Sequence, residues 1–127
     1  MDFYTGNINN TKISEVKIGN SRDVYIQWLI TKEGQGTVYA VRRFVIKPKG
    51  FIQMHYHEYY ESLYIIKGKC KVCVGDVKQV ELSAGDYIFI NSNVKHAIVN
   101  VGDEDLEFLC VINYPENMNI TSLNENC

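Results

Sequence analysis

FIQMHYHEYYESLYIIKG, residues 51–68, is the stretch of this 127-residue sequence that decides its fold. It is rich in aromatic and β-branched residues, which favour strands. His55 and His57 are separated by one residue, so both imidazoles project from the same face of a strand. Glu61 follows after a short loop, and Gly68 ends the second apolar run. The stretch therefore predicts two strands, with two imidazoles and a carboxylate near the loop that joins them.

The same pattern of short apolar runs broken by Gly, Asn, Asp and Pro continues through most of the chain, and helix signals are nearly absent. Strands at this close spacing predict an all-β sandwich or a barrel. The predicted strands are Val24–Ile30, Val38–Ile46, Phe51–His57, Ser62–Lys67, Lys69–Val74, Val77–Leu82, Tyr87–Ile90, His96–Asn100 and Leu106–Ile112, with a weaker one at Ile13–Ile18.

Length and composition favour one soluble domain spanning residues 1–127, because 46% of the residues are hydrophobic and 22% are charged. The ends, Met1–Lys12 and Glu116–Cys127, are polar, and we expect both to be loosely held. A net charge of −2 argues against a nucleic-acid partner. With no long apolar run and no leader sequence, we expect no membrane association and a cytoplasmic location.

The sequence contains four cysteines. Cys70 and Cys73 form a Cys-x-x-Cys pattern, but they lie within a predicted strand, where side chains three positions apart point to opposite faces. We therefore expect these two residues to form neither a disulfide nor a metal site. The pattern gives no role for Cys110 and Cys127.

Histidine is scarce in this chain, which contains only His55, His57 and His96. His96 begins another predicted strand about forty residues beyond the first pair. Together with Glu61, the three imidazoles make a set of nitrogen and oxygen donors that suits a divalent transition metal. Spacing alone leaves an ordinary alternative open, namely histidines that face solvent or pack in the core.

The positions of these residues resemble the two motifs of the cupin family. His55, His57, Glu61 and Gly68 match the first motif, in which Lys49 stands at the opening glycine. The second motif is matched by Gly85, His96 and Asn100, with Asn91 in place of a proline and Asn93 in place of a glycine. Asn tolerates the left-handed conformation that this glycine would supply. The resemblance covers residues 38–112.

The resemblance implies a double-stranded β-helix, or jelly-roll, barrel with a metal in its wide end. Carried over to this sequence, the metal ligands are His55, His57, Glu61 and His96. The implied cofactor is one divalent transition metal, which could be Fe, Mn, Ni, Cu, Co or Zn. Cupins are often homodimers whose N-terminal segment adds to the partner's sheet, and a strand at Ile13–Ile18 would suit that arrangement.

Three functions compete, because the cupin fold supports all of them. The first is an oxidoreductase similar to the quercetinase-like and acireductone-type dioxygenases, acting on a small enediol or phenolic substrate. In that case Glu61 is either a ligand alone or also a catalytic residue that moves a proton. The second is a non-redox metal enzyme, such as an isomerase or a decarboxylase. The third is a small-molecule-binding protein without turnover.

Residues around the motifs refine the expected pocket. The apolar candidates for the barrel interior are Phe44, Phe89, Ile98 and Phe108, and they favour the dioxygenase over an oxalate-type decarboxylase, which would need a polar, basic cavity. Other side chains have two open interpretations each. Gln53 either shares the face of the histidines or lies at the mouth of the barrel, and Tyr59 and Tyr60 either line the entrance or pack against neighbouring side chains. Arg42 and Arg43 alternate, so each points either inward, where it could bind an anion, or outward, where it would form a salt bridge.

Overall fold

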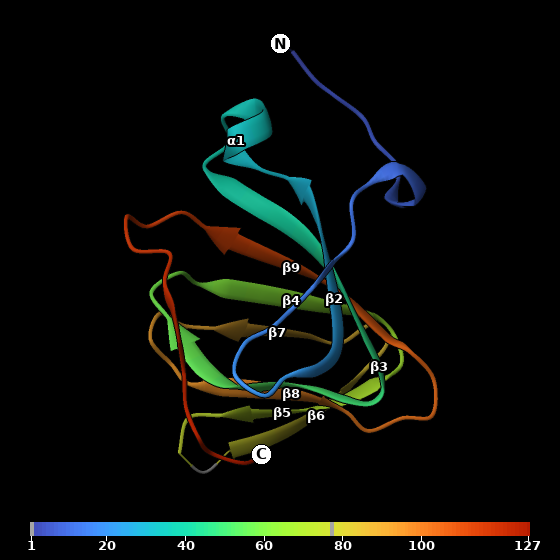
Figure 1. Ribbon diagram of the computed structural model, residues 1–127, viewed down its shortest axis with the longest axis vertical. Coiled ribbons are helices and arrows are strands. Elements are labelled where there is room, and N and C mark those ends of the chain that lie inside the picture. The colour runs from blue at the N-terminus through green and yellow to red at the C-terminus, as the bar shows by residue number, and fades with distance from the viewer. Residues whose placement is uncertain (1, 77) are drawn as a thin grey trace.

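One long strand, β3 (Tyr39–His57), organises the fold by running through both halves of the β-structure (Figure 1). Its first half pairs with β2 and β9, and its second half pairs with β8 and β10. The sequence predicted two separate strands here, broken at residues 48–50, and that boundary is wrong. The backbone turns at Lys49, whose φ is 68°, without leaving the sheet. Gly50 follows because a Cβ there would lie 2.7 Å from the backbone oxygen of Arg22.

The computed structural model describes residues 2–76 and 78–127. Its strands are β1 (Ser14–Glu15), β2 (Arg22–Ile30), β3 (Tyr39–His57), β4 (Glu61–Lys67), β5 (Lys69–Val74), β6 (Lys78–Ser83), β7 (Tyr87–Ile90), β8 (His96–Asn100), β9 (Leu106–Asn113) and β10 (Ile120–Ser122). A 3-10 turn, η1 (Ile8–Asn10), and a short helix, α1 (Lys32–Gln35), complete the elements of the described residues.

All strand pairs are antiparallel, and the main path through the sheet is β6-β5-β8-β3-β9-β4-β7. β2 and β10 pair with β3 off this path, so the sheet curls into a nearly closed barrel (Figure 1). The predicted all-β jelly-roll barrel is thus confirmed. No helix of the described residues is long and apolar enough to cross a membrane.

Several local predictions need correction. The strand predicted at Ile13–Ile18 is reduced to β1, and residue 77 of the strand predicted at Val77–Leu82 lies outside the described residues. The connection between the strands predicted at Val24–Ile30 and Val38–Ile46 contains α1, which is capped by Gly36 with a φ of 72°. Both polar ends, which we expected to be loosely held, make specific contacts within the described residues. The side chain of Gln27 donates to two backbone carbonyls of the N-terminal segment, and β10 pairs with β3 near the other end.

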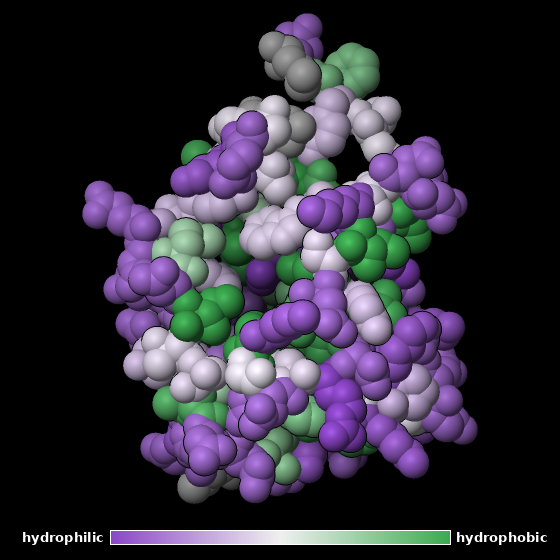
Figure 2. Space-filling model, viewed as in Figure 1, coloured by the Kyte–Doolittle hydropathy of each residue, from purple (hydrophilic) through white to green (hydrophobic). Residues whose placement is uncertain are grey.

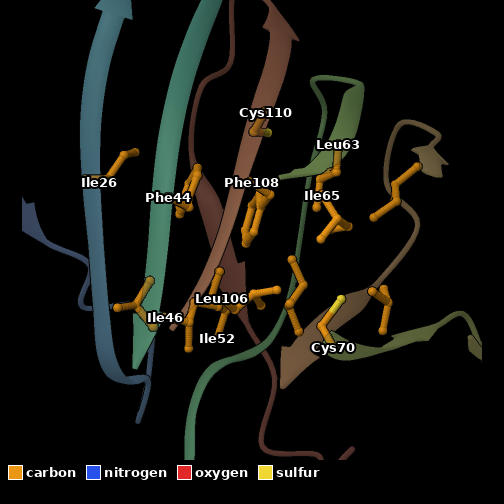
Figure 3. Close-up of a cluster of buried hydrophobic side chains, with 14 of the residues drawn as sticks. Ile26, Phe44, Ile46, Ile52, Leu63, Ile65, Cys70, Leu106, Phe108 and Cys110 are labelled. Carbon is orange, nitrogen blue, oxygen red and sulfur yellow. The ribbon is translucent and has the colours of Figure 1, made fainter. Parts of the chain in front are cut away.

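The core fills the space between the two halves of the barrel (Figure 3). Phe108 is almost fully buried and stacks on Phe44 with ring centroids 5.0 Å apart. Each such side chain contributes roughly 1.5–3 kcal/mol through the removal of apolar surface from water. Ile98 is also buried as predicted, but Phe89 is 59% exposed and does not face the interior. Strand alternation explains this, because Ile90 points inward and its neighbour must point out.

The cysteines are divided between two packing environments. Cys70 packs in the main core and Cys73 in a small second cluster, which confirms that they occupy opposite faces of β5. As predicted, Cys70 and Cys73 are not bonded to each other, but the expectation that Cys73 is outside any disulfide is wrong, because it is bonded to Cys127, 54 residues further along the chain. Nothing in the local strand pattern could reveal a partner so distant in sequence. Cys70 and Cys110 are buried free thiols.

Candidate metal centre

A β-bulge near the end of β3 aims the first two histidines into the barrel. Between Ile52 and His55 the register against β8 shifts, so that three steps on β3 correspond to two on its partner. His55 and His57 consequently share the interior with Ile52, and all three are buried. Gln53 does not share their face, because its side-chain amide donates to the backbone oxygens of Leu123 and Glu125 instead.

The other two candidate ligands reach the same place from different strands. His96 begins β8 and stands directly opposite His55 in the register, while Glu61 begins β4. All four side chains are buried, and one potential ligand atom from each lies within 4.8 Å of the others. The structure therefore brings together every residue of the predicted set, although their binding of a metal stays a prediction.

Backbone carbonyls orient each of the three imidazole rings. The Nδ1 atoms of His55, His57 and His96 lie 2.7–2.9 Å from the carbonyl oxygens of residues 53, 59 and 94. A carbonyl oxygen can only accept a hydrogen bond, so the ring nitrogen that faces it must be the donor. In the neutral rings Nδ1 therefore carries the hydrogen and Nε2 keeps a free lone pair. The same hydrogen-bond pattern that fixes a ring in a metalloprotein is thus present three times.

The carboxylate of Glu61 lies between two of these rings. Its Oε1 is 3.1 Å from His57 Nε2, and its Oε2 is 3.4 Å from His96 Nε2. Burial alone would raise the pKa of Glu61, but His57, His96 and the nearby guanidinium of Arg42 lower this pKa well below its usual value. Glu61 is therefore an ionised carboxylate at neutral pH, which is the form that ligates a metal.

Two of the rings titrate in opposite directions. Burial, reinforced by the charge of His96, lowers the pKa of His55 to about 4. Burial also acts to lower the pKa of His96, but hydrogen bonding and attraction to Glu61 raise it above the ordinary value. In the metal-free protein, His55 is therefore neutral at pH 7, and His96 is the ring that takes up a proton more readily.

These features fit a metal ion. The Nε2 atoms of His57 and His96 are buried without a hydrogen-bond partner, because an Nε2 without a proton cannot donate to the ionised carboxylate that it faces. A buried polar atom without a partner destabilises the folded state, so the convergence of two such lone pairs beside a carboxylate fits a bound cation. Ligands that share an ion at about 2.1 Å lie roughly 3–4 Å from one another, close to the spacings seen here.

A second layer of side chains surrounds the carboxylate. Arg42 points inward, where its Nη2 lies 3.3 Å from Glu61 Oε1 and 2.9 Å from the sulfur of Cys110. Tyr59 is buried and stacks on the ring of His57 at 3.7 Å between centroids. Arg43 points the other way and pairs with Glu107 at 2.6 Å. The alternation of side chains along a strand predicted that one of the two arginines points inward. It could not say which, because alternation alone does not show which face of the strand is the interior.

A cavity of about 560 Å³ lies beside the candidate ligands, with His55, Arg42 and Glu61 in its wall. Most of its lining is apolar, as expected, and comes from the barrel interior, the N-terminal segment and the C-terminal segment. Figure 2 shows the hollow near the middle of this face, with hydrophobic residues at its edge. Tyr59 contributes to the lining, whereas Tyr60 is exposed. Apolar lining residues include Ile26, Trp28, Phe44, Ile98, Phe108 and Met118.

Comparisons with known proteins agree with this geometry. The cupin domain family matches residues 42–112. An oxalate-binding protein of Thermotoga maritima is 32% identical over 111 residues, covering 83% of this chain and 91% of the relative. The solved structure of a predicted oxalate decarboxylase from the same organism has a TM-score of 0.79 and 26% identity, covering 88% of this chain and 100% of the other.

The fold also recurs at lower sequence identity. The polyketide cyclase RemF from Streptomyces resistomycificus gives a TM-score of 0.86 with 19% identity, covering 98% of this chain and 87% of that protein. Likeness at that level concerns the fold alone.

Proposed function

The chain belongs to the cupin domain family, and on that premise we propose that it is a mononuclear metal-dependent dioxygenase acting on a small enediol or phenolic molecule. The observation that carries the proposal is the placement of three imidazoles and one carboxylate at the wall of a mainly apolar cavity. His55, His57, His96 and Glu61 would hold one divalent transition metal. Such an ion supplies Lewis acidity and, when redox-active, electron exchange with dioxygen.

The residues of the chain have distinct tasks in this proposal. The three backbone carbonyls behind the imidazoles fix the direction of the Nε2 lone pairs. Arg42 orients the carboxylate of Glu61 through Oε1. The lowered pKa of Glu61 makes it a weak base, so ligation is its first role and proton transfer from a substrate hydroxyl its second. Burial raises the pKa of Tyr59 to about 12, which keeps its hydroxyl protonated.

The cavity sets the kind of molecule that fits. Its volume falls within the usual range for small organic ligands. Trp28 and Phe44 both lie close to Arg42, each with its ring centroid 5.1 Å from the guanidinium carbon. These flat apolar surfaces suit an aromatic or conjugated ring, and closure around such a ring would exclude water from the ligands.

A second candidate function is the binding or decarboxylation of oxalate, which is favoured by the 32% identical oxalate-binding relative. Oxalate is a small dianion that would leave most of this cavity empty. The single buried guanidinium beside the centre, Arg42, already bonds Glu61. The size and the mainly apolar lining of the cavity therefore make oxalate our second candidate, and a direct comparison can decide between the two.

The test begins with protein purified without a metal-affinity column. Elemental analysis should find about one transition metal per chain, and the loaded forms (Fe, Mn, Ni, Cu, Co and Zn) are then screened for oxygen uptake with phenols and enediols. Glu61→Gln should reduce turnover more than metal occupancy if Glu61 moves a proton, and both together if it only ligates. Tyr60→Phe, on the exposed neighbour of Tyr59, is the matched control and should change neither.

Two outcomes would replace the proposal. Tight calorimetric binding of oxalate without oxygen uptake in any metal form would favour the second candidate. Failure of the wild-type chain to retain any metal would overturn the metal-dependent function itself. The single-domain organisation of residues 1–127, the homodimer and the cytoplasmic location are parts of the proposal that size measurement and fractionation would test.

A further inference from the structure

The segment after β9, residues 114–127, crosses the face of the barrel next to the candidate metal centre (Figure 1). We call it the C-terminal strap. Its strand β10 pairs with the part of β3 that contains two candidate ligands, in the register Ile120 opposite His57 and Ser122 opposite His55. Met118 and Ile120 line the cavity. The strap thus borders both the ligand-bearing backbone and the space where a small molecule would bind.

Few non-covalent contacts hold the strap in place beyond this short ladder. The side-chain amide of Gln53 donates to the carbonyls of Leu123 and Glu125, and the backbone N–H of Leu123 donates to the carbonyl of Met54. Lys95 pairs with the Glu125 carboxylate at 2.7 Å on the surface. All three side chains of β10 are exposed. Tyr114 and Met118 pack against the main core, and Leu123 packs against the second cluster. These side chains are only partly buried, so the strap is expected to open at a lower free-energy cost than the barrel strands once its covalent attachment is removed.

The disulfide between Cys73 and Cys127 is the strong attachment of the strap. Cys73 lies on β5 opposite Ala97 of β8, and its neighbour Val74 lies opposite His96. The bond therefore links the segment that pairs with His55 and His57 to the strand beside the third imidazole. It spans the two sides of the candidate ligand set from outside the barrel.

We propose that the C-terminal strap is a redox-controlled clamp on the metal centre, closed by the Cys73–Cys127 disulfide and released by its reduction. The inference rests on the proposed function, because it concerns regulation of the same site. When the clamp is closed, the backbone at His55 is paired on both sides, with β8 and with β10, and the backbone at residues 56 and 57 is paired with β10. When it is released, one side of that backbone loses its partner and the cavity loses the cover of Met118 and Ile120.

The chemical step is thiol–disulfide exchange with a dithiol reductant. One reductant thiolate attacks a sulfur of the disulfide, the mixed disulfide is resolved by the second reductant thiol, and Cys73 and Cys127 each leave with a proton as a thiol. Two electrons pass from the dithiol, which departs as its own disulfide. Reducing compartments keep such bonds open, and oxidising conditions close them, so the ambient redox poise would set the state of the clamp.

Hydrogen exchange on the full-length protein tests the clamp without reference to metal. Oxidised protein and protein reduced with dithiothreitol are compared by mass spectrometry. We expect backbone amides of residues 120–123 and of residues 55–57 to exchange at least about tenfold faster after reduction. Cys127→Ser is the matched control, and it should show the fast rates with or without reductant. Unchanged exchange in reduced wild-type protein would overturn the inference.

Chelator-driven metal release provides the second readout. Zinc-loaded protein is mixed with excess EDTA, and reduction should accelerate zinc release in the wild type but not in Cys127→Ser, which should release zinc rapidly in both conditions. Equal release from oxidised and reduced wild type would refute the clamp while leaving the metal function intact. If zinc binds in neither state, hydrogen exchange alone decides whether the strap is released, and the elemental analysis described above decides the metal-dependent function.

Discussion

Removing metal and varying pH should reveal the opposed titrations of His55 and His96 as a maximum in stability. The pKa of His55 is lowered from 6.5 to about 4 in the folded protein. Between these values the unfolded chain binds more protons than the native one, so stability rises with pH. The contribution of His55 is fully present above about pH 6.5 and is lost as the pH falls through 4. A difference of 2.5 pKa units corresponds to about 3 kcal/mol.

The raised pKa of His96 acts in the other direction. Its contribution is fully present below the unfolded value and is lost as the pH rises above about 6.5. Glu61 has a lowered pKa, so its contribution falls away only in acid, below its unfolded value. Because the windows of the two histidines meet near pH 6.5 without overlapping, metal-free protein should be most stable there.

Urea unfolding of EDTA-treated protein, followed by fluorescence at closely spaced pH values, measures the effect. His55→Gln should abolish most of the slope between pH 4 and 6.5 and leave the decline above pH 6.5 in place. Saturating zinc should remove that decline, because metal binding requires neutral imidazoles and is favoured at higher pH. A metal-free wild-type profile that is flat below pH 6.5, or one identical to that of His55→Gln, would refute the reasoning.

Three further predictions concern the stability of the scaffold, measured as the free energy of unfolding by chemical denaturation. Lys49→Gly should be about 1 kcal/mol more stable than Lys49→Ala, because a left-handed φ penalises any side chain; equal stabilities would contradict this. Asn100→Ala should lower the free energy of unfolding by roughly 2–4 kcal/mol, because the buried amide makes three hydrogen bonds to the backbone. The control, Asn113→Ala, removes one exposed hydrogen bond and should lower the free energy of unfolding far less. Cys127→Ser should cost up to about 4 kcal/mol from loop closure, and a loss that persists in reductant would argue against the disulfide as its cause.

Local sequence pattern was sufficient to predict most of the strands and the inward pair of histidines. Side chains two positions apart on a strand project from the same face, and this alone brings His55 and His57 to one side of β3. The substituted glycine position was also predictable, since Asn93 adopts a φ of 62°. The motif spacing then placed Glu61 and His96, whose meeting with the first pair depends on strand pairing over about forty residues.

Two kinds of feature could not be predicted from the sequence: which face of a strand points to the interior, and which residues meet across long sequence separations. The bulge between Ile52 and His55 reverses the face of Gln53, and no residue type in that interval announces it. Phe89 was assigned inward on hydrophobicity alone, although its neighbours fill the interior instead. The disulfide of Cys73 joins segments 54 residues apart, and chain polarity wrongly suggested that the segment containing its partner was loose.

The charge balance of the centre favours an anionic ligand, and the walls of the cavity then discriminate between the candidate anions. In the proposed centre, three neutral imidazoles and one carboxylate would leave a divalent ion with a net charge of about +1, and the buried guanidinium of Arg42 adds a further positive charge. In a cavity of low dielectric this excess favours a ligand that binds as an anion. A phenolate or an enediolate meets that need, and so does oxalate. Since both candidate classes balance the charge, the apolar walls decide between them, because a conjugated ring can contact Trp28 and Phe44 whereas oxalate would leave those surfaces facing water.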